Sequence, residues 1–221
     1  STPWNDYGNG RIEFLDRHNI RCQFASQFLN NVHLRTRDNY AQFRYTYQCC
    51  RLSNEQTLPS IDTADPTTNR SLTTETPWCT RMRTSWNSWG NGDIQYLDRH
   101  VFRCPSDRAI ATMQLLYNSR GPIVSYDYTC CLPRIRAKSR HAELSLQDKL
   151  AGSDKLAGSA CHTRNTGWND WGNGRIMFLD RHVIGCVNNE YLNGVRFLSH
   201  GNQVVTYEFV CCSCINVCVI S

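Results

Sequence analysis

The chain has 221 residues, of which 40% are hydrophobic, and this excludes wholesale disorder because there are enough apolar side chains for a packed core. Its apolar runs are only a few residues long, so the sequence predicts no membrane insertion. The net charge is +5, and 21 of the 24 basic residues are arginine, whose planar guanidinium pairs with carboxylate or sulfate groups. These arginines are interleaved with acidic residues, so we expect no nucleic-acid partner, and acidic or sulfated glycans suit the charge better.

Thirteen cysteines indicate a disulfide framework formed in an oxidising compartment. They include three adjacent pairs, Cys49-Cys50, Cys130-Cys131 and Cys211-Cys212. Structural zinc is the alternative, but these adjacent pairs do not have the Cys-x-x-Cys spacing of zinc knuckles. We therefore predict a secreted, extracellular protein. A start at Ser1 without an apolar leader favours a mature form, and Asn69 begins a sequon for an N-linked glycan.

One motif occurs three times, at 4–10, 86–92 and 168–174, and its leading tryptophans are 82 residues apart in both steps. Each copy continues through Leu-Asp-Arg-His to a single cysteine and closes on a double cysteine. This period predicts three tandem modules joined by linkers. The expected boundaries are module 1 at 1–52, a linker at 53–78, module 2 at 79–133, a second linker at 134–160, and module 3 with a Cys-rich tail at 161–221.

The same elements are expected in the same order in every module. The Gly-Asn-Gly turn leads into a stretch predicted to be a strand, from Ile12 to His18 in the first copy. A loop of varying length follows, with tips at 37–39, 118–121 and 199–202. Segments 43–47, 124–128 and 204–209 alternate aromatic or β-branched residues and are predicted strands that run into the double cysteines. The sequence therefore predicts an all-β fold of three disulfide-stapled modules of about 50 residues each.

The spacing of the cysteines suggests their partners. Each single cysteine can close a loop onto its own double cysteine, which gives Cys22–Cys49, Cys104–Cys130 and Cys186–Cys211, although either member of a pair could be the partner. Cys79 and Cys161 could then take Cys50 and Cys131, while Cys212 could take Cys214 or Cys218. Six disulfides and one leftover cysteine would result, and we expect the leftover thiol in the tail, where it favours a disulfide-linked homodimer.

The aromatic endings of the modules, above all Tyr45 to Arg51, resemble the dermatopontin family. So do the Trp-led module and the cysteines that lie seven residues before Trp86 and Trp168. The resemblance implies a small secreted β protein of animal extracellular matrix that binds glycans or matrix proteins, as agglutinins and shell-matrix proteins of that family do. The family's Asp-Arg-x-Trp signature is absent before the last strand, so no binding residue is carried over.

The repeated turn is the strongest candidate for a ligand site. Aromatic rings offer flat apolar faces to sugars, and Asn amides and Arg guanidinium groups can bond hydroxyl or acidic groups. The alternative is that the tryptophans anchor the core and that Asn-Gly supplies left-handed backbone. The candidate residues are Trp4, Asn5, Tyr7, Asn9, Arg17, Trp86, Asn87, Trp89, Asn91, Arg99, Trp168, Asn169, Trp171, Asn173 and Arg181.

Two further kinds of chemistry are weighed for the same stretch. Asp16 and His18, with their copies, could form a catalytic pair, but no serine or cysteine nucleophile recurs beside them, so a structural role is expected and the protein is predicted not to be an enzyme. Asn5, Asn9 and Asp16 are spaced as in a calcium loop, yet one carboxylate is little to offset the dehydration of calcium. We expect no metal and no other cofactor, with calcium as the alternative.

Together these features predict an extracellular, multivalent, lectin-like carbohydrate-binding or matrix-adhesion protein, with glycans and matrix proteins as partners. The alternative is a structural component of an extracellular or biomineral matrix that does not bind sugar. A membrane-active toxin is disfavoured, because the sequence has no amphipathic or long apolar segment.

Overall fold

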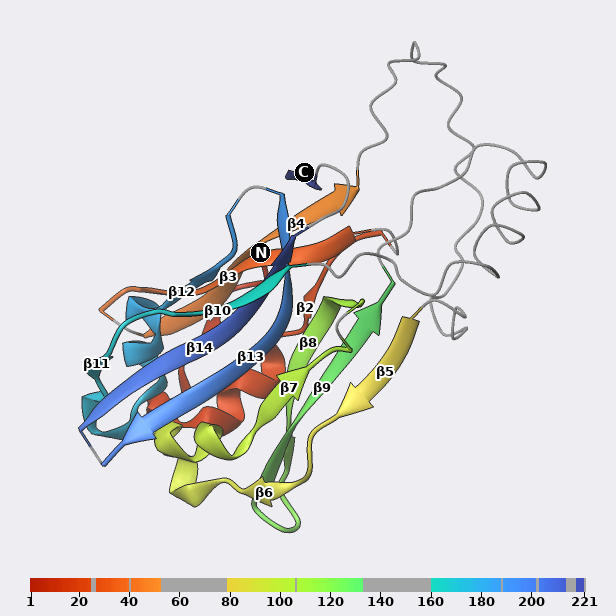
Figure 1. Cartoon of the computed structure of the whole chain (residues 1–221). Coiled ribbons are helices and arrows are strands. Elements are labelled where there is room, and N and C mark those ends of the chain that lie inside the picture. Colours follow the sequence, from red (N-terminus) through yellow and green to blue (C-terminus); the bar gives the residue numbers. More distant parts are fainter. Residues whose placement is uncertain are drawn as a thin grey trace, which may run out of the picture.

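The computed structural model describes residues 1–24, 27–39, 41–52, 79–105, 107–132, 160–187, 189–201, 203–213 and 218–220, and it is mostly β-sheet (Figure 1). Three five-stranded sheets carry the fold. The first contains β1 (Asn5–Asp6), β4 (Gln42–Leu52), β3 (Gln27–Arg37), β12 (Val183–Gly185) and β15 (Cys218–Ile220). The second contains β2 (Ile20–Arg21), β8 (Ala109–Asn118), β9 (Ile123–Cys131), β5 (Cys79–Arg83) and β6 (Asn87–Ser88). The third contains β10 (Cys161–Asn165), β14 (Val204–Ser213), β13 (Glu190–His200), β7 (Val101–Arg103) and β11 (Asn169–Asp170).

A long antiparallel hairpin is the centre of each sheet, formed by β3–β4, β8–β9 and β13–β14. Their second strands contain the alternating segments that were predicted to be strands, and this prediction is confirmed. The hairpins turn at the expected tips, where Asp38, Asn39 and Gly201 have positive φ values of 53°, 53° and 55°. Asn and Gly suit such turns because they adopt left-handed backbone at little cost.

Each sheet also receives a short strand from a different third of the chain, and the first sheet receives β15 from the last third as well. Strand β2 pairs with β8, β7 pairs with β13, and β12 pairs with β3, so the exchange runs in a closed cycle. One hydrophobic core follows from it, in which buried residues of all three hairpins pack together, among them Leu34, Leu115 and Phe197. The three segments therefore share one interior instead of folding around three separate ones.

The stretch from Ile12 to His18 is not a strand, and neither are its copies, so this prediction was wrong. It forms a 3₁₀ helix, η2 (Ile12–Arg17), and the same holds for η4 (Ile94–Arg99) and η6 (Ile176–Arg181). Backbone hydrogen bonds between residues three apart, such as His18 N–H to Leu15 O, form the turns of these helices. Ile12 and Leu15 are both buried, at 0% and 2% exposure, and a spacing of three places them on one face of a 3₁₀ helix. The Gly-Asn-Gly turn suggests a following strand, but the buried residues spaced by three favour the 3₁₀ helix.

The three loop-closing disulfides, Cys22–Cys49, Cys104–Cys130 and Cys186–Cys211, are present as predicted. The second set differs from the prediction, because Cys79 bonds to Cys131 and Cys161 bonds to Cys212. Strand register decides this, since each of these partners lies directly opposite the other on paired strands, Cys79↔Cys131 and Cys161↔Cys212. The partners therefore come from one module, which the spacing alone did not reveal.

Cys50 was expected in a disulfide and is instead a free thiol with 0% exposure. Burial raises its pKa to about 11, so it stays protonated and unreactive near neutral pH. Its strand β4 pairs with β15, so the C-terminal strand takes the edge position that β5 and β10 occupy in the other two sheets. Cys214 and Asn69 lie outside the described residues, as does the side chain of Cys218, and the tail-linked dimer stays a prediction.

Within the described ranges, no helix has both the length and the apolar character needed to cross a membrane.

The shared core leads to a first prediction about chain cleavage. A protease site placed between residues 134 and 159 would cut the chain without touching any of the five described disulfides, none of which crosses that interval. We expect the two fragments to stay together on native gel filtration, because β12 and β7 hold them to each other's sheets. Denaturant with reductant should separate them. Independent elution under native conditions would show that the modules fold separately.

Candidate functional site

The repeated turn has one geometry in all three copies, η1 (Gly8–Gly10), η3 (Gly90–Gly92) and η5 (Gly172–Gly174). A side-chain oxygen two residues upstream accepts the backbone N–H of the first glycine, at 2.6 Å for Asp6 Oδ1 and Gly8. The same bond is formed by Asp170 at 2.6 Å and by Ser88 at 3.2 Å. The central asparagines, Asn9, Asn91 and Asn173, have φ values of 61°, 60° and 53° and are exposed. Left-handed backbone therefore explains why Asn stands there.

The first glycine of each turn lies against the ring of an aromatic residue in the following 3₁₀ helix. An added Cβ on Gly90 would fall 1.9 Å from the Tyr96 ring, and the equivalent distances are 2.2 Å for Gly8 to Phe14 and 1.8 Å for Gly172 to Phe178. The predicted ligand arginines stack on these same rings. The guanidinium carbon lies 4.3 to 4.4 Å from the ring centroid in the pairs Arg17–Phe14, Arg99–Tyr96 and Arg181–Phe178. These arginines therefore cover the aromatic residues that pack against the turns.

The two aromatic positions of the motif have opposite environments. Tyr7, Trp89 and Trp171 pack against the shared core and are only partly exposed. Two of the leading tryptophans are exposed, Trp86 at 39% and Trp168 at 55%, whereas Trp4 is only partly exposed. Single exposed aromatic side chains are normal on protein surfaces, so what distinguishes Trp86 and Trp168 is that both are exposed at equivalent positions of the repeat. The second aromatic residue therefore packs against the core in all three copies, while the leading tryptophans Trp86 and Trp168 are open to solvent.

The surroundings of the three leading tryptophans differ. Trp4 lies close to two guanidinium groups, with Arg37 and Arg44 at 4.4 and 4.5 Å from its ring centroid. Trp86 has Arg83 at 5.9 Å, and Trp168 has the His200 ring at 6.3 Å. Arg44 Nε is buried and has no hydrogen-bond partner in the described structure. An arginine next to the indole is thus common to Trp4 and Trp86, with the strongest positive charge beside Trp4, whereas Trp168 has a T-shaped contact with a histidine ring.

The Asp-Arg-His segments serve contacts between different parts of the chain. Asp180 Oδ2 accepts the Thr36 hydroxyl at 2.8 Å, and Asp98 Oδ2 accepts the Ser199 hydroxyl at 2.5 Å. Asp16 does not have the same partner, and its backbone oxygen accepts a bond from Gln114 Nε2 at 2.9 Å. Each 3₁₀ helix is thus joined to the hairpin that receives the next short strand, through the carboxylate at Asp98 and Asp180 and through the backbone oxygen at Asp16. The Asp residues of these segments thus make contacts that hold different parts of the chain together.

The histidines of these segments are buried beside the core, each with 1% exposure. Each Nδ1 contacts a threonine hydroxyl, and the distances are 2.7 Å for Thr2–His18, 2.9 Å for Thr84–His100 and 2.6 Å for Thr166–His182. Burial, and then the adjacent arginine, lower the pKa of His18 and of His182 to about 4, and the pKa of His100 also falls. All three rings are therefore neutral near pH 7, and each packs edge-on against a tyrosine at 5.7 Å.

Sequence reasoning missed these threonines. They stand two residues before each leading tryptophan, so they recur with the same 82-residue spacing as the turn itself. Arg37, Arg44 and His200 were missed as well, because they reach the tryptophans from the hairpin tips. Their spacing from the tryptophans in sequence carries no signal, and only strand pairing brings them together.

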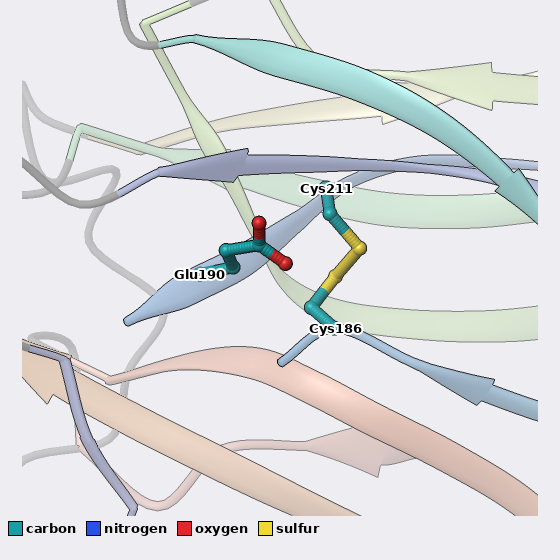
Figure 2. Close-up of side chains that lie close together, drawn as sticks. All are labelled: Cys186, Glu190 and Cys211. Carbon is teal, nitrogen blue, oxygen red and sulfur yellow. A yellow bond between two sulfur atoms is a disulfide. The ribbon is translucent and has the colours of Figure 1, made fainter. Parts of the chain in front are cut away.

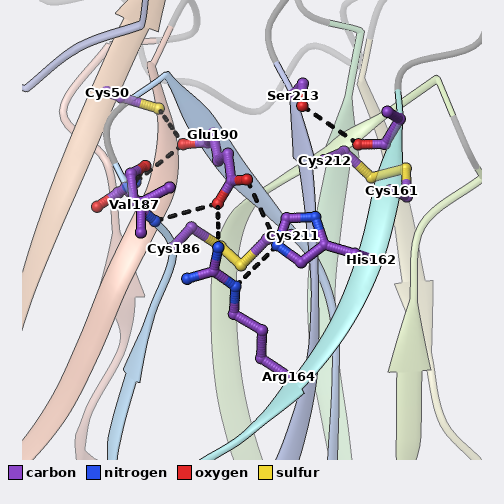
Figure 3. The surroundings of a disulfide bond; sticks show 12 residues. Cys50, Cys161, His162, Arg164, Cys186, Val187, Glu190, Cys211, Cys212 and Ser213 are labelled. Carbon is purple, nitrogen blue, oxygen red and sulfur yellow. Dashed lines mark hydrogen bonds and ion pairs between the residues drawn. A yellow bond between two sulfur atoms is a disulfide. The ribbon is translucent and has the colours of Figure 1, made fainter.

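One group of three metal-type side chains was found among the residues the structure describes, Cys186, Glu190 and Cys211 (Figure 2). The two sulfurs are joined in a disulfide and so cannot act as thiolate ligands. Glu190 is occupied by other partners, since its Oε2 accepts the Val187 N–H at 3.1 Å and lies 3.4 Å from Arg164 Nη2 (Figure 3). The group therefore stabilises the loop after Cys186.

His162 lies beside this carboxylate, with its Nε2 3.4 Å from Glu190 Oε1. Arg164 Nε donates a hydrogen bond to the same nitrogen at 2.7 Å. One ring nitrogen cannot accept the arginine hydrogen and donate to the carboxylate at once. The arginine contact is the shorter one, so we assign Arg164 as the cation that balances Glu190.

Comparison of the chain with protein-family models, with curated proteins and with solved structures found no match. The resemblance to the dermatopontin family thus stays a prediction based on the sequence motifs alone.

The packing of the turn leads to a second prediction. Gly90→Ala should lower the free energy of unfolding by about 2–4 kcal/mol, because the methyl group would overlap the Tyr96 ring and φ is +59°. Urea unfolding followed by circular dichroism measures the change. Gly121→Ala is the matched control, since its added Cβ meets nothing within 4 Å, and it should shift stability by less than about 0.5 kcal/mol. Equal effects of the two variants would contradict the packing described for the turn.

The buried histidines lead to a third prediction, about pH. Their pKa is lower in the folded than in the unfolded chain, so between about pH 6.5 and 4 the unfolded state binds more protons. Stability should therefore be complete above pH 6.5 and fall as the pH drops towards 4, by about 1.4 kcal/mol per pH unit for each of His18 and His182.

Urea midpoints measured from pH 7 to pH 4.5 test this. His182→Gln should be less stable at pH 7 and should show a shallower fall with pH than the natural chain. His200→Gln, at an exposed histidine, is the control and should keep the original slope. An unchanged slope for His182→Gln would mean that this ring does not resist protonation in the folded state.

Proposed function

We propose that the chain is a secreted, multivalent, lectin-like protein that binds acidic or sulfated glycans at its three leading tryptophans. The observation that carries the proposal is the exposure of Trp86 and Trp168 at equivalent positions of the repeated turn. A flat indole face next to a cation suits a sugar, because the ring packs on C–H groups while the cation pairs with carboxylate or sulfate.

The covalent framework supports the extracellular part of the proposal. Five disulfides are consistent with an oxidising compartment. Two of them join strands directly across a sheet edge, Cys79–Cys131 and Cys161–Cys212, at Cα–Cα distances of 4.0 Å. These two bonds tie the edge strands β5 and β10 covalently to their neighbours β9 and β14.

A structural matrix component that binds no sugar is the second candidate, and the surroundings of Trp4 favour it. Arg37 and Arg44 both lie near this indole, so a ligand there would compete with contacts that the protein already makes. If all three tryptophans were covered in this way, they would serve as packing surfaces only. Trp168, the most exposed of them, is therefore the position that separates the two candidates.

A sugar titration is the fourth prediction. Trp168→Ala should remove one of three weak sites, each binding at roughly −4 to −6 kcal/mol, and should leave the free energy of unfolding within about 0.5 kcal/mol. Ligand-observed NMR with sialyllactose, sulfated lactose and lactose measures binding, and the acidic sugars should bind best. Phe24→Ala is the matched control, because Phe24 is 58% exposed but lies outside the repeated turn.

The control variant should bind like the natural chain. If none of the three sugars binds, or if Trp168→Ala unfolds the protein, the aromatic turn is a scaffold and the matrix-component candidate is favoured.

A further inference from the structure

The hairpins give the molecule two distinct ends. At one end, the second cysteines of the double pairs, Cys50, Cys131 and Cys212, pack in one small cluster with Phe28 and Tyr191. We call this the cysteine end. Because β4, β9 and β14 each reach this cluster with their last residues, all three hairpins run towards it in the same direction.

The three Gly-Asn-Gly turns meet at the opposite end, which we call the turn end. The second glycine of each turn contacts a residue of another copy, namely the one directly after that copy's turn, and the three contacts form a closed cycle. The closest approach of its ideal Cβ is 3.0 Å for Gly10 to Arg175, 2.6 Å for Gly92 to Arg11 and 2.7 Å for Gly174 to Asp93. Three mutual contacts of this kind require the turns to lie together. In Figure 1 the 3₁₀ helices lie at the lower left, beside the hairpin turns, and β15 lies at the upper side.

Strand register places the leading tryptophans at the turn end too. Each is followed by a short strand that pairs with the first part of a hairpin's second strand, at Asn5↔Phe43, Asn87↔Val124 and Asn169↔Val205. Each tryptophan therefore lies a few residues from a hairpin tip and far along the strand from the double cysteine. The contacts of Trp4 with Arg37 and of Trp168 with His200 agree, since both partners are the last residues of β3 and β13.

From this arrangement we propose that the three sites open towards one side, so that a single molecule binds one densely glycosylated surface with several sites and does not bridge two surfaces. This inference rests on the proposed function and adds its geometry and its partner. Sites held on one rigid end engage neighbouring glycans together, because the shared core fixes their relative positions. The cysteine end, with β15 and both cross-strand disulfides, then faces away from that surface.

The experiment uses monomer purified by gel filtration and the best binder among sialyllactose, sulfated lactose and lactose. The sugar is biotinylated and loaded on a streptavidin surface at low and at high density. We expect low density to reproduce the affinity for the free sugar and high density to raise the apparent affinity by about 10²–10⁴-fold. The double variant Trp86→Ala with Trp168→Ala should lose this gain, and Phe24→Ala, an exposed aromatic outside the turn end, should keep it.

Vesicles that display the same sugar test the direction of the sites. The monomer should coat them without raising light scattering, whereas two copies of the chain fused through a flexible linker should aggregate them. Aggregation by the monomer, or equal affinity at both densities, overturns the inference while sugar binding itself stands. Absence of binding to all three free sugars overturns the proposed function and the inference with it.

Discussion

The exchange of short strands between hairpins is the constraint on which the rest of the structure depends. Strands β2, β7 and β12 each leave their own third of the chain and pair with the next hairpin, in a closed cycle. No third can then complete its sheet or bury its apolar face alone. Hydrogen bonds between paired strands and a common core hold the thirds together, while the described disulfides stay within each third.

Buried polar side chains reinforce the exchange where the chain passes from one third to another. Asn193 has 1% exposure, and its Nδ2 lies 2.7 to 3.3 Å from the carbonyl oxygens of Cys104, Pro105 and Arg108. Asn30 Nδ2 likewise donates hydrogen bonds to the carbonyl oxygens of Val187 and Glu190. An unpaired carbonyl in these loops would lose its hydrogen bond to water without replacement, so a buried amide is well suited to the position. The third equivalent position is Ala111, whose backbone oxygen accepts the Cys22 N–H.

The aromatic residues of the repeated turn divide between scaffold and surface according to the sheet geometry. Trp89 is fixed by the Tyr117 ring at 5.7 Å and by the Arg11 guanidinium at 5.6 Å, so it belongs to the interface between turns. Trp86, three residues earlier, precedes the short edge strand β6 and remains outside. Identical spacing in three copies could not separate these roles, because scaffold and site are copied together.

The sequence by itself determined the β class, the hairpin strands, the loop-closing disulfides and the residues of the turn, because alternation, cysteine spacing and left-handed asparagines are local signals. The strand predicted at Ile12–His18 is instead a 3₁₀ helix, because Ile12 and Leu15, three residues apart, are both buried on one face of it. Only the tertiary structure decided the partners of Cys79 and Cys161, the free thiol of Cys50 and the exposure of Trp168. Each of these depends on which strands lie side by side, and pairing between distant segments leaves no periodic trace in the chain.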